Sequence, residues 1–135
     1  MAAVLSVNLA AARLFVHVLA ATVWVGGQLV LAALVPALRR AAPDAPRRAA
    51  RAFNRVAWPA FAVLIASGIW NVLAVGDQGQ RYRTTLVVKL VLVAASGIGA
   101  LLHARSRTTT GLAVWGAVTL AGAVGALFVG VLLAG

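Results

Sequence analysis

The residues best suited to chemistry lie in the first apolar stretch, where His17, Trp24 and Gln28 interrupt a run of hydrophobic residues. At about 100° per residue, Trp24 and Gln28 each fall about 20° from His17 on opposite sides, so an α-helix would carry all three on one face. An imidazole, an indole N–H and a carboxamide are costly inside a bilayer unless they face a partner, a cavity or a cofactor. This polar stripe is therefore the first candidate for a functional site.

Lys89, Ser67 and Asn71 are expected in the same layer of the membrane as His17. With a rise of ~1.5 Å per residue, His17 and Lys89 lie roughly 6 Å and 9 Å inside the same outer boundary. His103 lies about 21 Å from Lys89 along the third span, so the two histidines are not expected to share a ligand. We expect His17 and Lys89, contributed by parallel spans, to converge on one pocket beneath the extracytoplasmic leaflet.

Ordinary structural roles would also explain these residues. A buried histidine often simply hydrogen-bonds a neighbouring side chain or a backbone carbonyl. A lysine as close to a span end as Lys89 can snorkel to the interface. Trp58, Trp70 and Trp115 are typical of interfacial or packing residues. The polar layer therefore has both a functional and a purely structural interpretation.

The composition identifies an integral membrane protein. Of the 135 residues, 63% are hydrophobic and 10% are charged, and the mean hydropathy is +0.99, whereas a soluble domain carries roughly 25% charged residues. Four apolar stretches are each close to the ~20 residues needed to cross a bilayer: residues 14–38, 56–75, 86–102 and 112–133. The expected fold is an all-α, four-helix transmembrane bundle with short loops, forming a single domain over residues 1–135. Residues 1–12 are expected to extend the first helix or to lie at the interface, and not to be a cleaved signal.

The net charge of +10 comes from arginines at the ends of these spans. Residues 39–55 predict a basic amphipathic helix, with Asp44 as its N-cap, that lies along the headgroups before the second span. The two loops on that side carry eight basic residues: Arg39, Arg40, Arg47, Arg48, Arg51, Arg55, Arg105 and Arg107. The positive-inside rule places these loops in the cytoplasm and both termini outside the inner membrane. Anionic lipid headgroups are therefore the expected partners, and nucleic acid is not.

The sequence also excludes several kinds of chemistry. It has no cysteine, which excludes disulfides, zinc–thiolate sites and thiol catalysis. Met1 is the one methionine, so there is no thioether path for Cu(I). Neither acidic residue lies in a predicted span, so an acid–base pair would have to be His17 and Lys89, and enzymatic activity is the least supported function.

Four short motifs resemble those of the membrane domain of the copper-resistance protein D (CopD-like) family. They follow the family's order along residues 17–103: His17-x6-Trp24-x-Gly26-Gly27, Arg51-x-Phe53-Asn54-Arg55, Ser67-Gly68-Ile69-Trp70 and Leu86-Val-Val-Lys89-Leu90. The same landmarks are similar to those of the HemJ-type protoporphyrinogen oxidases, small haem-binding membrane proteins. A first-span histidine and a later lysine are the important pair in those oxidases, so the resemblance places these roles on His17 and Lys89 and implies possible oxidoreductase activity.

Three functions are compatible with the sequence. A b-type haem could be bound by His17, with Lys89 as second ligand or propionate partner, and with Gly26 and Gly27 making room for the macrocycle beside Trp24, Gln28 and Asn71. The family resemblance alternatively implies handling or transport of copper, with His17 as a metal ligand. A third alternative is a non-catalytic assembly subunit that meets a second copy or a redox partner through the small residues of its last span, such as Gly122, Ala126 and Gly130.

Overall fold

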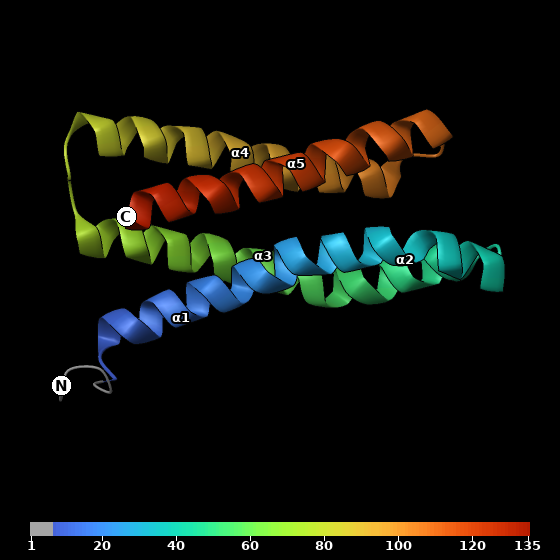
Figure 1. Cartoon of the computed structure of the whole chain (residues 1–135), viewed down its shortest axis with the longest axis horizontal. Coiled ribbons are helices and arrows are strands. Elements are labelled where there is room, and N and C mark those ends of the chain that lie inside the picture. Colours follow the sequence, from blue (N-terminus) through green and yellow to red (C-terminus); the bar gives the residue numbers. More distant parts are fainter. Residues whose placement is uncertain (1–6) are drawn as a thin grey trace. The chain divides into compact units, whose positions relative to one another are not determined.

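A computed structural model describes residues 7–135, which are almost entirely helical (Figure 1). The elements are, in order, α1 (Leu9–Ala21), a π-helical turn (Thr22–Gly26), α2 (Gly27–Ala41), α3 (Ala45–Val75), α4 (Gln80–Arg105) and α5 (Thr109–Ala134). The first three form one continuous helix of 33 residues, so the described part of the chain has four helices long and apolar enough to cross a membrane. The all-α class with four apolar helices is confirmed.

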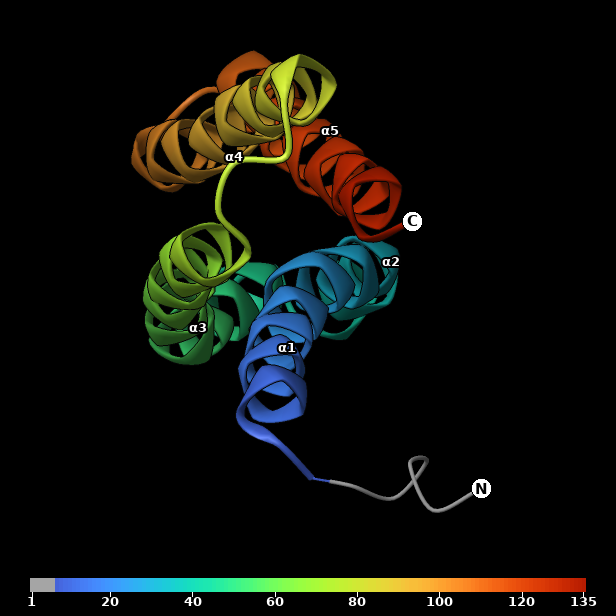
Figure 2. The same ribbon diagram turned by 90° about the vertical axis from the view of Figure 1, so that its left-hand side faces the viewer.

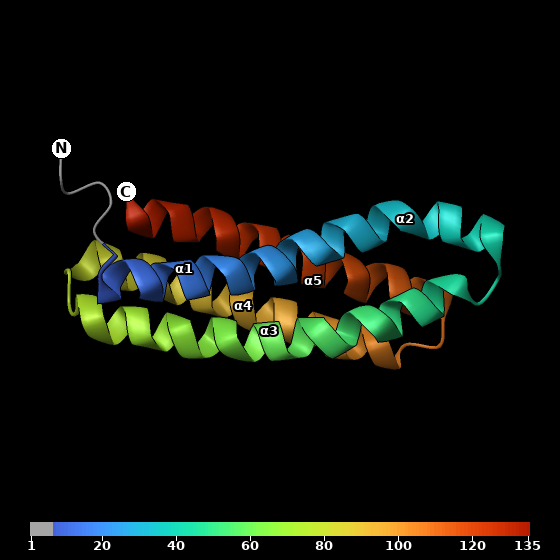
Figure 3. The ribbon, with the colours of Figure 1, turned by 90° about the horizontal axis from the view of Figure 1, so that it is seen from below.

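The chain divides into two compact units, one ending at Gly76 and the other covering Asp77–Gly135. In the first unit α3 packs against both α1 and α2. In the second unit α4 and α5 pack against each other along their length (Figures 2 and 3). Each unit therefore has interhelical contacts of its own, and a single domain over residues 1–135 stays a prediction.

Each helix extends beyond the apolar stretch predicted for it, because backbone hydrogen bonding continues into polar flanks that hydropathy does not count. α1 begins at Leu9, where the Asn8 side chain accepts a hydrogen bond from the Ala11 N–H at 2.8 Å. Residues 9–12 extend the helix as expected, and residues 1–6 lie outside the described part of the chain. α5 begins after Thr108, whose hydroxyl accepts from the Gly111 N–H at 3.0 Å and so caps the helix.

The basic segment after α2 is helical, as predicted, and it is the beginning of α3. The 31-residue helix runs without interruption through Pro59, so no separate element lies between the two spans. Asp44 takes the N-cap position, but its side chain makes no capping hydrogen bond. Its carboxylate instead lies 3.3 Å from Nε of Arg48, one turn along the helix. The predicted position of Asp44 is right and its predicted capping role is wrong.

The connection to α4 is a short turn built on two glycines with positive φ, Gly76 at 72° and Gly79 at 93°. Asp77 accepts hydrogen bonds from the Gly79 N–H at 2.9 Å and from Nε of Arg83 at 3.0 Å. The Arg83 guanidinium and, to a smaller extent, the Gly79 N–H lower the pKa of the Asp77 carboxyl, since both stabilise its charged form. The carboxylate thus fixes the turn against the start of α4.

Small residues bring α4 and α5 into close contact. A Cβ on Gly122 would lie 2.8 Å from the backbone oxygen of Leu92, and a Cβ on Gly99 would lie 2.8 Å from the backbone nitrogen of Thr119. The buried Ser96 hydroxyl donates to the Thr119 carbonyl at 2.8 Å. The small-residue face of α5 is therefore already used within the chain, and an assembly role would need another face.

Gly122→Ala should lower the free energy of unfolding by about 1–3 kcal/mol, because the added methyl has no room against the α4 backbone. Gly26→Ala is the matched control, since no atom lies within 4 Å of where that Cβ would stand. Denaturation with sodium dodecyl sulfate, followed by circular dichroism, measures both variants. Equal stability of the two variants would contradict the packing described for Gly122.

Candidate functional site

His17 is held against α3 by a hydrogen bond with a buried serine. Its Nδ1 lies 2.8 Å from Oγ of Ser67, and the Ser67 hydroxyl donates its proton to the Leu64 carbonyl at 3.2 Å. A serine hydroxyl has one proton, so when it donates to Leu64 the Ser67 oxygen accepts from the Nδ1–H of His17. The lone pair of the imidazole is then on Nε2. The structure therefore confirms that His17 and Ser67 share one layer, and this arrangement favours the Nδ1–H tautomer.

A glycine allows this contact. A Cβ on Gly68 would lie 3.3 Å from Cε1 of His17, closer than most side-chain contacts. The imidazole thus lies directly over the backbone of α3, and Ser67 is only 4% exposed. The Ser67-Gly68 pair supplies both the hydrogen-bond partner and the space for the ring.

A second polar layer lies one turn further toward the start of α1. Arg13 precedes His17 by four residues, and Asn71 follows Ser67 by four, so antiparallel α1 and α3 place the two at one level, ~6 Å from His17 along the axis. Nε of Arg13 and Oδ1 of Asn71 are both buried and have no hydrogen-bond partner within residues 7–135. An unmatched donor and an unmatched acceptor therefore lie beside the imidazole layer.

Trp24 lies on the π-helical turn and, like His17, contacts α3. Backbone hydrogen bonds in this turn join residues i and i+5, so the rotation of about 100° per residue assumed between His17 and Gln28 does not hold across it. Trp24 is nonetheless 3% exposed, with its ring centroid 4.3 Å from that of Phe61 and 5.4 Å from that of Trp58. Trp24 thus packs against Trp58 and Phe61 of α3 in an aromatic cluster.

The remaining predicted residues of the first unit differ in their surroundings. A Cβ on Gly27 would overlap the ring of Phe53, so helix packing alone requires glycine there. Gly26 has no such neighbour. Gln28 is half-buried in the first turn of α2. Of the two glycines, Gly26 alone leaves space beside the helix.

Lys89 belongs to the second unit, and its side chain lies against α5. Its Nζ is 3.0 Å from the point where a Cβ on Gly130 would stand. This places the ammonium close to the C-terminal end of α5, where the helix dipole favours positive charge. A pocket shared by Lys89 and His17 would combine residues of two different units, so it stays a prediction.

His103 holds the two helices of the second unit together. Its Nδ1 lies 2.8 Å from the Leu112 carbonyl oxygen, which can only accept, so Nδ1 carries a proton. A Cβ on Gly116 would lie 3.2 Å from the same nitrogen. No sequence pattern indicates this contact, because its acceptor is a backbone atom on the next helix.

No group of three or more His, Cys, Asp or Glu side chains within residues 7–135 could hold a metal ion. Comparisons of the chain with protein-family models, with curated proteins and with solved structures found no match. The candidate site is therefore defined by the geometry around His17.

Ser67→Ala should lower the free energy of unfolding by about 1–3 kcal/mol, because it leaves the Nδ1–H of His17 without its acceptor in a buried layer. Ser106→Ala is the control, since the Ser106 hydroxyl donates to the Leu102 carbonyl of its own helix near the end of α4. It should change stability by less than about 0.5 kcal/mol. The same denaturation assay compares them, and equal losses would show that the His17 contact contributes nothing specific.

Proposed function

We propose that this chain is a multi-pass membrane protein that binds a b-type haem through Nε2 of His17, near the extracytoplasmic side, and serves in redox reactions or in haem and metal homeostasis. The supporting observation is the hydrogen bond from Nδ1 of His17 to Ser67. Histidines that ligate metals usually donate their other ring N–H to a neighbouring acceptor, which fixes the tautomer and the ring orientation. When bound, the haem would supply one-electron chemistry.

The layer beside His17 offers groups suited to the polar edge of a haem. Arg13 can donate from its buried Nε to a propionate carboxylate, and charge-assisted bonds of this kind are stronger than neutral ones. Asn71 lies at the same level and presents an unmatched acceptor, which a bridging water could satisfy. Both residues belong to the same unit as His17, so this part of the proposal does not depend on the second unit.

Lys89 keeps the role implied by the resemblance, as second ligand or as a further propionate partner. Gly26 is the predicted glycine that leaves space for a flat ring, whereas the space beside Gly27 is filled by Phe53. Copper handling is supported by the resemblance alone, because His17 has no cluster of further ligands within the described residues. An assembly role has no specific observation in its favour.

The test is the absorption spectrum of the full chain, expressed with added haem precursor and purified in detergent. The wild type should show a Soret band, and His17→Ala should lose it because the axial nitrogen is gone. His103→Ala is the matched control and should keep the band, since Nδ1 of His103 only joins α4 to α5. A colourless wild type, or a His17→Ala variant with an unchanged Soret band, would contradict the proposal.

Two further variants test the contributions of Arg13 and Lys89 in the same experiment. Arg13→Gln should weaken haem affinity about tenfold while keeping the Soret band, because one charge-assisted hydrogen bond is lost. Lys89→Met should shift the Soret maximum if Lys89 is a ligand, and should only weaken affinity if it pairs with a propionate. Arg107→Gln, an exposed site before α5, should leave both quantities unchanged.

A further inference from the structure

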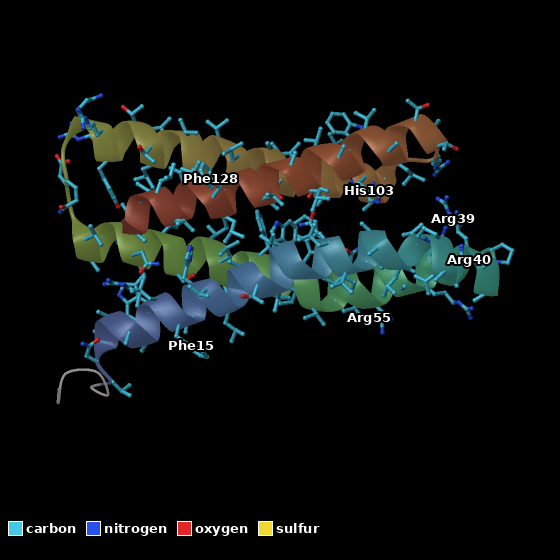
Figure 4. All side chains as sticks on the ribbon, in the orientation of Figure 1. Phe15, Arg39, Arg40, Arg55, His103 and Phe128 are labelled. Atoms are coloured by element: carbon cyan, nitrogen blue, oxygen red, sulfur yellow. The ribbon has the colours of Figure 1, made fainter. Side chains whose placement is uncertain are left out.

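The arginines at the start of α3 form a stripe on one face of that helix. Phe53 marks the face that packs against α2, because its ring occupies the space beside Gly27. At about 100° per residue, Arg47, Arg51 and Arg55 lie about 120°, 160° and 160° from Phe53 around the helix. All three side chains are exposed. The stripe therefore faces away from α2, and Arg55 can be followed in Figure 4.

The stripe ends where the apolar part of α3 begins. Residues 56–75 span about 30 Å, which is the thickness of the hydrocarbon core. The distance from Arg47 to Arg55 along the axis is about 12 Å, so the stripe begins in the adjoining headgroup layer, which is about 5–8 Å thick, and extends past it. Arg55 and Arg51 are thus at the level of the lipid headgroups when the apolar part of α3 crosses the bilayer, and the long side chain of Arg47 can extend toward that level.

The same face of α3 continues as apolar surface. Ala62, Ile65 and Ile69 lie about 180°, 120° and 160° from Phe53, on the side of the stripe. All three are exposed. A cationic segment followed by an exposed apolar segment on one helix face matches an amphiphile, with its phosphate at one end and its acyl chains at the other. A nucleic acid would leave the apolar part uncovered.

No acidic side chain of the protein neutralises the stripe. The sequence has two acidic residues. The carboxylate of Asp44 pairs with Arg48, and that of Asp77 pairs with Arg83. The counter-ion for the stripe must therefore come from outside the chain.

We propose that Arg47, Arg51 and Arg55 form a binding site for the phosphate of an anionic phospholipid whose acyl chains lie along Ala62, Ile65 and Ile69. Arginine suits this role because its planar guanidinium presents paired N–H donors to phosphate oxygens. The site is independent of the haem proposal, since none of its residues is proposed to bind the haem.

Native mass spectrometry of the full chain in an uncharged detergent tests this site, with phosphatidylglycerol as the probe. The wild type should retain phosphatidylglycerol in preference to phosphatidylcholine. Arg51→Gln should weaken binding about fivefold, and the triple change of Arg47, Arg51 and Arg55 to Gln should weaken it on the order of a hundredfold. The corresponding change of all three to Lys keeps the charge but loses the paired N–H donors, so it should bind more weakly than the wild type and more tightly than the Gln variant.

The matched control changes Arg81, Arg105 and Arg107 to Gln, which removes the same charge from exposed sites elsewhere. It should bind phosphatidylglycerol within about twofold of the wild type, because net charge alone does not form the site. Circular dichroism checks that each variant remains helical, and Arg51→Gln alone decides the matter if the triple variant does not fold. Any one of four results would overturn the proposal. These are equal losses in both triple variants, equal binding of phosphatidylcholine, displacement by equimolar inorganic phosphate, and tighter binding of a short duplex DNA.

Discussion

A hydrogen-bonding group inside hydrocarbon must find its partner within the protein, and the Ser67 hydroxyl satisfies this constraint for two groups at once. It donates to the Leu64 carbonyl of its own helix and accepts from His17 of α1. The contact holds α1 against α3 and favours a lone pair on Nε2 of His17. The proposed ligand role of His17 and the polar layer of Arg13 and Asn71 both depend on it.

The two units use the same device with different consequences. In each, an imidazole Nδ1 on one helix bonds the neighbouring helix, and a glycine there, Gly68 or Gly116, makes room for the ring. His103 bonds a backbone carbonyl near the α4–α5 turn, which is a sufficient structural explanation for it. His17 has additional polar groups beside it with unmatched hydrogen-bonding capacity. This difference separates a helix-packing histidine from a candidate ligand.

Hydropathy and spacing predicted the four apolar helices and the common layer of His17 and Ser67, because each depends on local composition or on depth along a helix. The π-helical turn was not predictable in this way, since a change from i+4 to i+5 hydrogen bonding leaves no compositional mark. The partner of His103 and the ion pair of Asp44 were missed because they depend on three-dimensional contacts. The pairing of His17 with Lys89 remains a hypothesis from depth and resemblance.

The central claim is that Ser67 holds His17 as the Nδ1–H tautomer, with its lone pair on Nε2. The most direct measurement is nitrogen-15 NMR of the haem-free full chain, labelled at histidine and reconstituted in lipid. The account predicts a protonated Nδ1 and an unprotonated Nε2 for His17, and a loss of this preference in Ser67→Ala. A wild-type signal with the proton on Nε2 and the lone pair on Nδ1 would contradict the claim.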